Sequence, residues 1–431
     1  MTGSWQSFNW TSTEVPHHPP SERERAEYGI PLTLRPVPGP EAPQRSVFDP
    51  ALKQHPNAYR AADPAFRDPA LAKAWLRARR RAMDLVLAAI ADSPWVDDLV
   101  LRGSVLLRAW FGEQAREPGD LDFVVVPAGR GIEDPRSAAM LDGIAAAAQL
   151  TAEQDDRGVR FDAREAVAED IWTYERVPGR RLVLPWTAEG LPGGVVQLDF
   201  VFNEPLPVPP EPTAVPGLER RRSPVLNAAT PELSLAWKVM WLLTDRYGQG
   251  KDLRDAVLLA EHGPLRPEVL REVFAEGEGY YALHPPGAAA LRRAVAGVEW
   301  KHFVTEYPAF ADREAEHGQR LLTALAPTFA GLPDLPEEDR AHLRRWLAAW
   351  VERYREPFAR DGFDALQEAL ARRLGHYPAA VVITRELLGP DRHGLTETEQ
   401  LLRAHPAWSG WHGYYQRNPG RLAEDLAPCD W

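Results

Sequence analysis

Two aspartates separated by one residue, Asp120 and Asp122, are the side chains of this sequence best suited to chemistry. They open an apolar run that continues to Val126 and is typical of a β-strand. Because residues i and i+2 of a strand point to the same face, the two carboxylates are expected to converge. Adjacent carboxylates are costly unless a cation neutralises them, and oxygen-rich sites suit Mg²⁺ or Mn²⁺. The pair therefore predicts a divalent-metal site.

A third carboxylate, Asp199, lies within a second apolar run, Val195–Phe202. A charged residue inside a buried strand needs a partner or a metal. Three acids from two adjacent strands can hold two metal ions, and such a pair activates a hydroxyl and stabilises a leaving pyrophosphate. Asp199 is therefore expected to complete the metal site and to serve as the general base.

Gly103 and Ser104 follow a short predicted strand and precede a short predicted helix. Glycine lets the backbone approach a ligand closely, and the serine hydroxyl and the helix N-terminal amides can donate hydrogen bonds to a phosphate. The two residues are therefore expected to bind a triphosphate. An Asp-x-Asp at a strand end is also common in turns, so the ordered combination carries more weight than any one motif.

The elements that must position these residues fall into three parts along the chain. Residues 1–68 are rich in proline and predict an extended or partly disordered N-terminal arm. The aromatic residues Trp5, Phe8 and Trp10 favour an arm that docks onto the fold. Residues 69–216 alternate helical and strand patterns and predict an α/β (α+β) module with a mixed sheet. Residues 217–431 predict a mainly helical domain, in which Thr230 is the expected N-cap of the first long helix.

The helices and strands of the α/β module are predicted from apolar periodicity. In chain order they are a helix at 70–91, a strand at 98–102, a helix at 105–111, a strand at 120–126, a helix at 136–150, and strands near 159–161, 181–185 and 195–202. The proline-dense stretch 205–216 is expected to be a linker. Later helices are expected near 252–261, 266–275, 317–330, 337–354 and 363–373.

The composition narrows the class of protein. The formal net charge is −12, which argues against wholesale non-specific binding of nucleic acid but leaves room for a local basic patch. Cys429 is the single cysteine, so neither an intrachain disulfide nor a cysteine-based zinc site can form. No apolar run reaches 18 residues and no secretory signal is visible, so a cytoplasmic protein without a membrane partner is expected.

Two successive stretches carry a resemblance to a known family. They are Leu99–Arg108, with the sequence LVLRGSVLLR, and Pro118–Phe123, with the sequence PGDLDF. Together they resemble the AbiEii/AbiGii toxin family of nucleotidyltransferases, part of the polymerase β-like superfamily, in which a glycine-serine type turn precedes an Asp-Leu-Asp-Phe strand.

A downstream helical motif extends this resemblance. The family has a lysine, an arginine and an Arg-Asp-x-x-Asp-Leu signature there. The corresponding residues of this chain are Leu235–Lys238, Asp245-Arg246 and Lys251–Asp255. Lys251 stands where the family usually has arginine, and Ala256 where it usually has leucine. The motifs span residues 99–262, a little over a third of the chain.

The resemblance implies an enzyme that transfers a nucleoside monophosphate from an NTP to an acceptor hydroxyl, with Mg²⁺ or Mn²⁺. Lys238 and Arg246 would contact the triphosphate. Asp252 would be the acid of the last motif, where it orients Lys238 or positions the acceptor. The ordinary alternatives are a surface lysine and an acid that complements a helix N-terminus. Asp255 shares the helix face of Asp252, so the two are not separated by sequence.

The biological role that the resemblance implies is a toxin of a toxin–antitoxin or phage-defence system. Its acceptor would be RNA such as tRNA, or a protein, and an antitoxin protein would be a partner. Two alternatives remain open from the residues. One is a nucleotidyltransferase for a small molecule of the antibiotic type, which needs a closed pocket rather than a basic rim. The other is a catalytically inactive binding module with the same fold.

Overall fold

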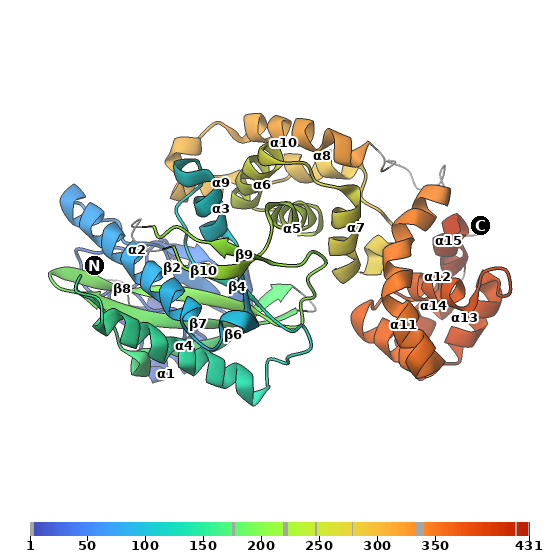
Figure 1. The fold of residues 1–431 in the computed structure, drawn as a ribbon, viewed down its shortest axis with the longest axis horizontal. Helices are drawn as coiled ribbons and strands as arrows, with labels where there is room; N and C mark the ends of the chain where they lie inside the picture. The colour runs from blue at the N-terminus through green and yellow to red at the C-terminus, as the bar shows by residue number, and fades with distance from the viewer. Residues whose placement is uncertain are drawn as a thin grey trace. The chain divides into compact units, whose positions relative to one another are not determined.

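The computed structural model describes residues 4–174, 177–218, 223–245, 248–277, 279–330, 332, 340–418, 420–429 and 431. The chain divides into two compact units, Met1–Ala229 and Thr230–Trp431 (Figure 1). The metal-site candidates Asp120, Asp122 and Asp199 all belong to the first unit. Lys238 and Asp252 belong to the second.

A mixed sheet forms the centre of the first unit. Its strands are β3 (Leu99–Arg102), β4 (Leu121–Val125), β5 (Val159–Phe161), β6 (Val167–Tyr174), β7 (Val177–Ala188), β8 (Leu191–Val201), β9 (Glu211–Ala214) and β10 (Val225–Ala228). The order is β5-β7-β8-β4-β3-β10-β9, and β6 also pairs with β7. Strands β4 and β8 are parallel, as are β3 and β10, whereas the other neighbours are antiparallel. This confirms the mixed sheet expected from the sequence.

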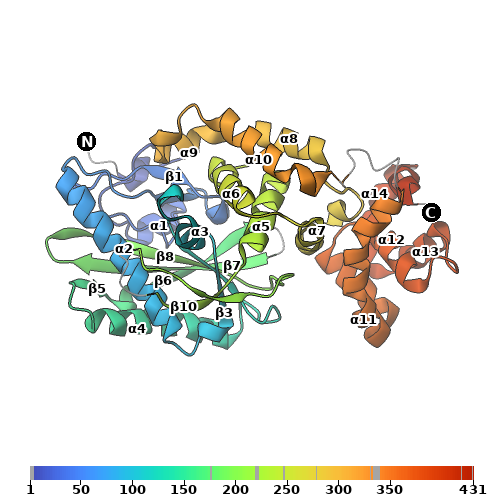
Figure 2. The same cartoon turned by 45° about the horizontal axis from the view of Figure 1, so that its top comes forward.

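One face of the sheet is covered by α2 (Pro69–Ala91) and α4 (Pro135–Glu153), which pack on one another (Figures 1 and 2). The Trp75 ring of α2 lies 5.6 Å from the Trp186 ring of β7. On the same face, Phe123 of β4 stacks on Phe200 of β8 with ring centroids 5.6 Å apart, and both side chains are fully buried. Because strand residues alternate between faces, Asp122 and Asp199 point to the opposite face.

The N-terminal segment, residues 4–68, covers part of that opposite face. It contains η1 (Trp5–Ser7), α1 (Glu22–Tyr28), β1 (Ser46–Phe48), η2 (Pro50–Leu52) and β2 (Tyr59–Ala61), none of which the sequence predicted. Trp5 and Phe8 are buried in a small cluster of their own, whereas Trp10 is 79% exposed. The Glu169 carboxylate of β6 accepts hydrogen bonds from the backbone amides of Leu32 and Thr33, which fastens the segment to the sheet.

The proline-dense stretch expected to be a linker instead supplies a strand. Residues Glu211–Ala214 form β9, which pairs antiparallel with β10 at the edge of the sheet. Pro212 lies within β9, and proline is tolerated at an edge because one side of the strand needs no ladder hydrogen bonds. Strands β6, β9 and β10 were missed because their mixed composition has no clear period-2 pattern.

The second unit is helical, which confirms the helical C-terminal domain. Its helices are α5 (Pro231–Thr244), α6 (Gly250–His262), α7 (Pro267–Glu276), α8 (Ala288–Ala296), α9 (Trp300–Glu306), α10 (Glu314–Phe329), α11 (Arg340–Arg373), α12 (Tyr377–Leu388), α13 (Leu395–Arg403), α14 (Ser409–Arg417) and α15 (Arg421–Leu426). The Thr230 side chain accepts a hydrogen bond from the Leu233 amide, so it caps α5 as predicted. Helix α11 covers residues 340–354 of the segment expected at 337–354, whose first three residues lie outside the described ones, and all of the segment expected at 363–373. It is interrupted at Gly362, where φ is 81°.

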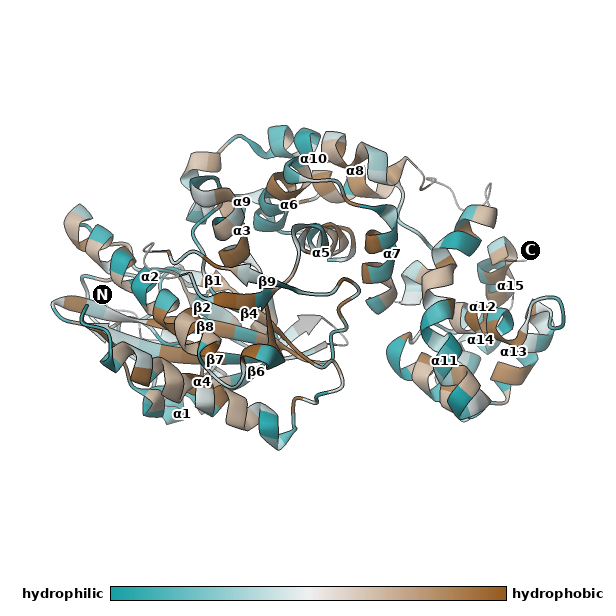
Figure 3. Ribbon diagram, in the orientation of Figure 1, coloured by the Kyte–Doolittle hydropathy of each residue, from teal (hydrophilic) through white to brown (hydrophobic). Residues whose placement is uncertain are grey.

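The helices of the second unit carry many buried apolar side chains. Hydrophilic and hydrophobic residues are interspersed along α11, as Figure 3 shows. In the described part of the chain, no helix combines the length and the apolar composition needed to cross a membrane.

Candidate metal centre

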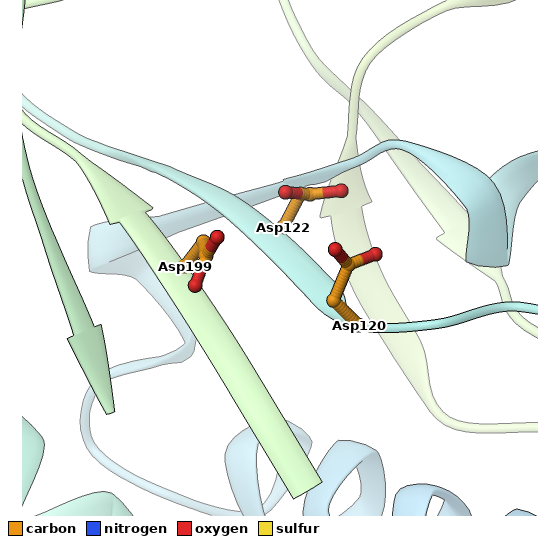
Figure 4. Close-up of side chains that lie close together, drawn as sticks. All are labelled: Asp120, Asp122 and Asp199. Atoms are coloured by element: carbon orange, nitrogen blue, oxygen red, sulfur yellow. The ribbon is translucent and has the colours of Figure 1, made fainter. Parts of the chain in front are cut away.

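The three predicted acids converge where β4 begins, beside the C-terminal part of β8. Asp120 immediately precedes β4, Asp122 is its second residue, and Asp199 lies in β8 directly opposite Asp122. One carboxylate oxygen from each side chain lies within 4.8 Å of the others, and the three carboxylates face a common point (Figure 4). The parallel register of β4 and β8 produces this convergence, because opposite residues of paired strands share a face.

The spacing of these oxygens fits a divalent cation. Mg²⁺ binds oxygen at about 2.1 Å, so two ligands on opposite sides of the ion lie about 4.2 Å apart. Within the described ranges, no second group of three histidine, cysteine, aspartate or glutamate side chains comes this close together. Three carboxylates at one point also repel one another, and a bound Mg²⁺ or Mn²⁺ would remove that repulsion.

Two arginines flank the acids on the same face of the sheet. Arg181 of β7 lies opposite Asp199, and Arg102 of β3 lies opposite Asp122, so a row of two acids between two guanidinium groups crosses four strands. Arg102 donates a hydrogen bond to Glu204 at 2.9 Å, and both side chains are buried. The positive charge of Arg102 is therefore shared with an acid outside the row.

Arg181 grips Asp199 with two parallel hydrogen bonds. Its Nε and Nη2 donate to the two carboxylate oxygens, each at 2.8 Å, and its Nη1 donates to Asp49 at 2.7 Å. Burial raises the pKa of the Asp199 carboxyl, and the nearby Arg181 opposes that rise. The two acids in turn raise the pKa of the Arg181 guanidinium, which stays charged despite its burial.

Sequence reasoning missed both Arg181 and Asp49. Arg181 follows Arg180 at the start of the predicted strand 181–185, so its sequence context is that of a charged strand end rather than of a lone charge in an apolar run. Asp49 lies in the proline-rich N-terminal segment, where nothing in the local sequence distinguishes it from an ordinary helix-capping aspartate.

Gly103 lies against Asp122. Its φ is +82°, a backbone conformation that favours glycine, and a Cβ at this position would lie 2.2 Å from Asp122 Oδ2. Ser104 begins α3 (Ser104–Phe111), whose N-terminus has no side-chain cap among the described residues. The Ser104 hydroxyl is buried and has no hydrogen-bond partner in the described part of the chain. A turn with uncapped amides beside the acids fits the expected phosphate contacts.

Lys238, Asp252 and Asp255 form a buried charge cluster within the second unit. Lys238 Nζ lies 2.6 Å from Asp252 and 3.4 Å from Asp255, and 4.9 Å from the centre of the Trp241 ring. Lys238 is 7% exposed, so it is not a solvated surface lysine. Both acids contact the ammonium group, and Asp252 makes the shorter contact. Arg246, the remaining predicted nucleotide contact, lies outside the described residues.

The sequence and the fold are similar to those of known nucleotidyltransferase toxins. The family described as "Nucleotidyl transferase AbiEii toxin, Type IV TA system" matches residues 85–329, more than half of the chain. No curated protein matches. Among solved structures, the chain is similar to MenT4, a nucleotidyltransferase toxin from Mycobacterium tuberculosis H37Rv, with 18% sequence identity and a TM-score of 0.37. That similarity covers 66% of this chain and 90% of the MenT4 chain.

Proposed function

We propose a reaction for this chain, which belongs to the AbiEii family of nucleotidyl transferase toxins of type IV toxin–antitoxin systems. The chain transfers a nucleoside monophosphate from an NTP to an acceptor hydroxyl, and the reaction depends on Mg²⁺ or Mn²⁺. The convergence of Asp120, Asp122 and Asp199 beside the Gly103-Ser104 turn carries this proposal. Carboxylates that hold divalent metal next to a phosphate-binding turn are the parts that phosphoryl transfer requires.

The three acids have different proposed roles at this site. Asp120 and Asp122 would hold the metal, together with Asp199, and the bound cation would neutralise charge that builds up on the phosphates. The acceptor oxygen attacks the α-phosphorus, and the bond from that phosphorus to the oxygen that leads to the β-phosphate breaks. Pyrophosphate leaves with that oxygen. Asp199 would accept the proton of the acceptor hydroxyl as general base.

The nucleotide contacts come from two parts of the chain. Gly103 and Ser104 would bind the triphosphate through backbone amides and a hydroxyl. Lys238 and Arg246 would add positive charge to the triphosphate contacts. The 2.6 Å contact between Lys238 and Asp252 supports the role of Asp252 as the acid that orients the lysine.

The proposed acceptor is RNA such as tRNA, or a protein, and the proposed partner is an antitoxin protein. Membership in a family of nucleotidyl transferases makes the chain an enzyme, which argues against the alternative of an inactive binding module. A small-molecule acceptor is the remaining alternative, and the experiment described next distinguishes it.

The test incubates the full-length protein with each α-labelled NTP, Mg²⁺ and a cell extract, and then separates RNA, protein and small molecules. We expect label in the RNA or the protein fraction, from one NTP above the others. Label in small molecules alone would favour the antibiotic-type alternative. Asp122→Ala should abolish the labelling, whereas Asp156→Ala, which changes a side chain that is 96% exposed, should not. Undiminished transfer by folded Asp122→Ala protein would overturn the metal-site assignment.

A further inference from the structure

We infer that the N-terminal segment, residues 4–68, completes the metal centre: Asp49 holds Arg181, and Arg181 holds Asp199 in position to bind the cation. This inference rests on the proposed function, because it assigns Asp199 to the metal site. It makes Arg181 and Asp49 positioning residues, which act through Asp199. The matched part of the family begins at residue 85, so Asp49 lies outside it.

Arg181 links Asp49 to Asp199 and fixes the orientation of the Asp199 carboxylate. Its side chain is 3% exposed and lies between two carboxylates, with two hydrogen bonds to Asp199 and one to Asp49. A bidentate guanidinium fixes the plane of the carboxylate that it binds. Each carboxylate oxygen keeps a second lone pair on the side away from Arg181, so one oxygen of Asp199 can still bind a cation while Arg181 holds the carboxylate.

The positive charge of Arg181 is shared between the carboxylates of Asp49 and Asp199. Paired with Asp199 alone, the guanidinium would cancel the charge of that acid and weaken its attraction for a cation. Asp49 supplies a second buried carboxylate that shares the charge of Arg181, and Arg60 also lies near enough to Asp49 to lower the pKa of its carboxyl. Asp49 therefore has two roles. It accepts a hydrogen bond from Arg181, and it offsets part of the arginine charge, so that Asp199 attracts a cation more strongly.

Both carboxylate oxygens of Asp49 accept hydrogen bonds, which fix the position of this side chain. Its Oδ1 accepts a hydrogen bond from the Ala51 amide at the start of η2, and its Oδ2 accepts the bond from Arg181. Leu52, at the end of η2, packs with Ala58 against Ile171 of β6. The N-terminal segment is thus packed against the strand next to β7, and its position is not set by the Arg181 contact alone.

The test uses Asp49→Asn in the full-length protein. The asparagine Oδ1 can keep the cap on the Ala51 amide, whereas the amide nitrogen that replaces Oδ2 cannot accept from Arg181. We expect the affinity for Mn²⁺, titrated by electron paramagnetic resonance, to fall about 10-fold, because changes to groups that orient a metal ligand cost 10–100-fold. Arg181→Lys keeps the positive charge but loses the bidentate contact, so it should also weaken Mn²⁺ binding.

The matched control is Asp155→Asn. Asp155 is a partly buried aspartate of the first unit, and it pairs with Arg81 and Arg157 instead of with the row that contains Asp199. This variant should lower the melting temperature and leave Mn²⁺ affinity unchanged. Unchanged Mn²⁺ affinity in folded Asp49→Asn protein would overturn the inference. If the wild-type protein binds no Mn²⁺ and transfers no nucleotide, the proposed function fails instead, so the two failures are distinguishable.

Discussion

At the scale of single residues, Gly103 is the position where space is tightest beside the acids. A Cβ there would collide with Asp122 Oδ2, and the positive φ would add strain of about 1–3 kcal/mol. We expect Gly103→Ala to lower kcat/KM about 100-fold, because displacing a reacting group by about 1 Å has an effect of that size. Steady-state nucleotide transfer at saturating Mg²⁺ measures this.

Gly112 provides the control for that variant. It also has a positive φ, of 56°, but a Cβ there meets no described atom within 4 Å. Gly112→Ala should therefore reduce stability by a similar amount and leave catalysis intact. Equal loss of activity in both variants would show that backbone strain, rather than the contact with Asp122, is responsible.

Lys238 is the residue on which the buried charges of the second unit depend. Replacing it by methionine leaves Asp252 and Asp255 buried without their shared ammonium group. Removing one partner of a buried ion pair costs about 3–5 kcal/mol, and we expect a decrease of that order in the free energy of unfolding of Lys238→Met. Urea denaturation measures it. Lys251→Met, which changes an exposed lysine of the same region, should alter stability by less than about 0.5 kcal/mol.

At the scale of elements, the register between β4 and β8 decides the metal centre. Phe123 and Phe200 stack on one face, so the residues one position earlier, Asp122 and Asp199, meet on the other. A slip by one residue would bury an acid in the core and expose a phenyl ring. The hydrophobic pairs therefore fix the positions of the acids.

Helix α10 carries a histidine that makes stability depend on pH. His317 is fully buried, its Nδ1 lies 2.8 Å from the Arg313 carbonyl oxygen, and its Nε2 has no partner among the described residues. Burial lowers the pKa of His317, with help from Arg254 and Arg320. The folded protein thus holds a neutral ring, whereas the unfolded chain takes up a proton near pH 6.5.

Because the pKa of His317 is lower in the folded than in the unfolded state, acid pH favours unfolding. The stability contributed by neutral His317 is complete above about pH 6.5 and is lost as the pH falls from there toward the lowered pKa of the folded state. We expect the melting temperature of His317→Gln to fall less than that of the wild type between about pH 7.5 and about pH 5.5. The control is His302→Gln, since His302 is 85% exposed. An identical fall in wild type and His317→Gln would contradict the prediction.

At the scale of the whole molecule, the net charge of −12 gives a divalent cation a favourable field. A ligand that binds only the folded state stabilises it by about 2.7 kcal/mol at 100 times its Kd. We therefore expect Mg²⁺ to raise the melting temperature of the wild type and EDTA to reverse the rise. Calorimetry of Asp122→Asn in the same buffers should show no shift. A Mg²⁺ shift of wild-type size in that variant would mean that the ion binds elsewhere.

Sequence by itself determined the local features of this protein. Periodicity predicted α2, α3, α4, β3, β4 and β8 to within a few residues, because apolar spacing depends on neighbours along the chain. The Asp-x-Asp spacing placed Asp120 and Asp122 on one face by strand geometry alone. The same reasoning identified Thr230 as a cap, since capping is decided within one turn of helix.

Only the tertiary structure decided which distant residues meet. The pairing of β4 with β8 placed Asp199 beside Asp122, and the pairing of β7 with β8 added Arg181. Asp49 reaches Arg181 because the N-terminal segment packs on the sheet, a contact between residues far apart in sequence. Strand order and docking depend on burial summed over many elements, and that sum has no signature in any local stretch of sequence.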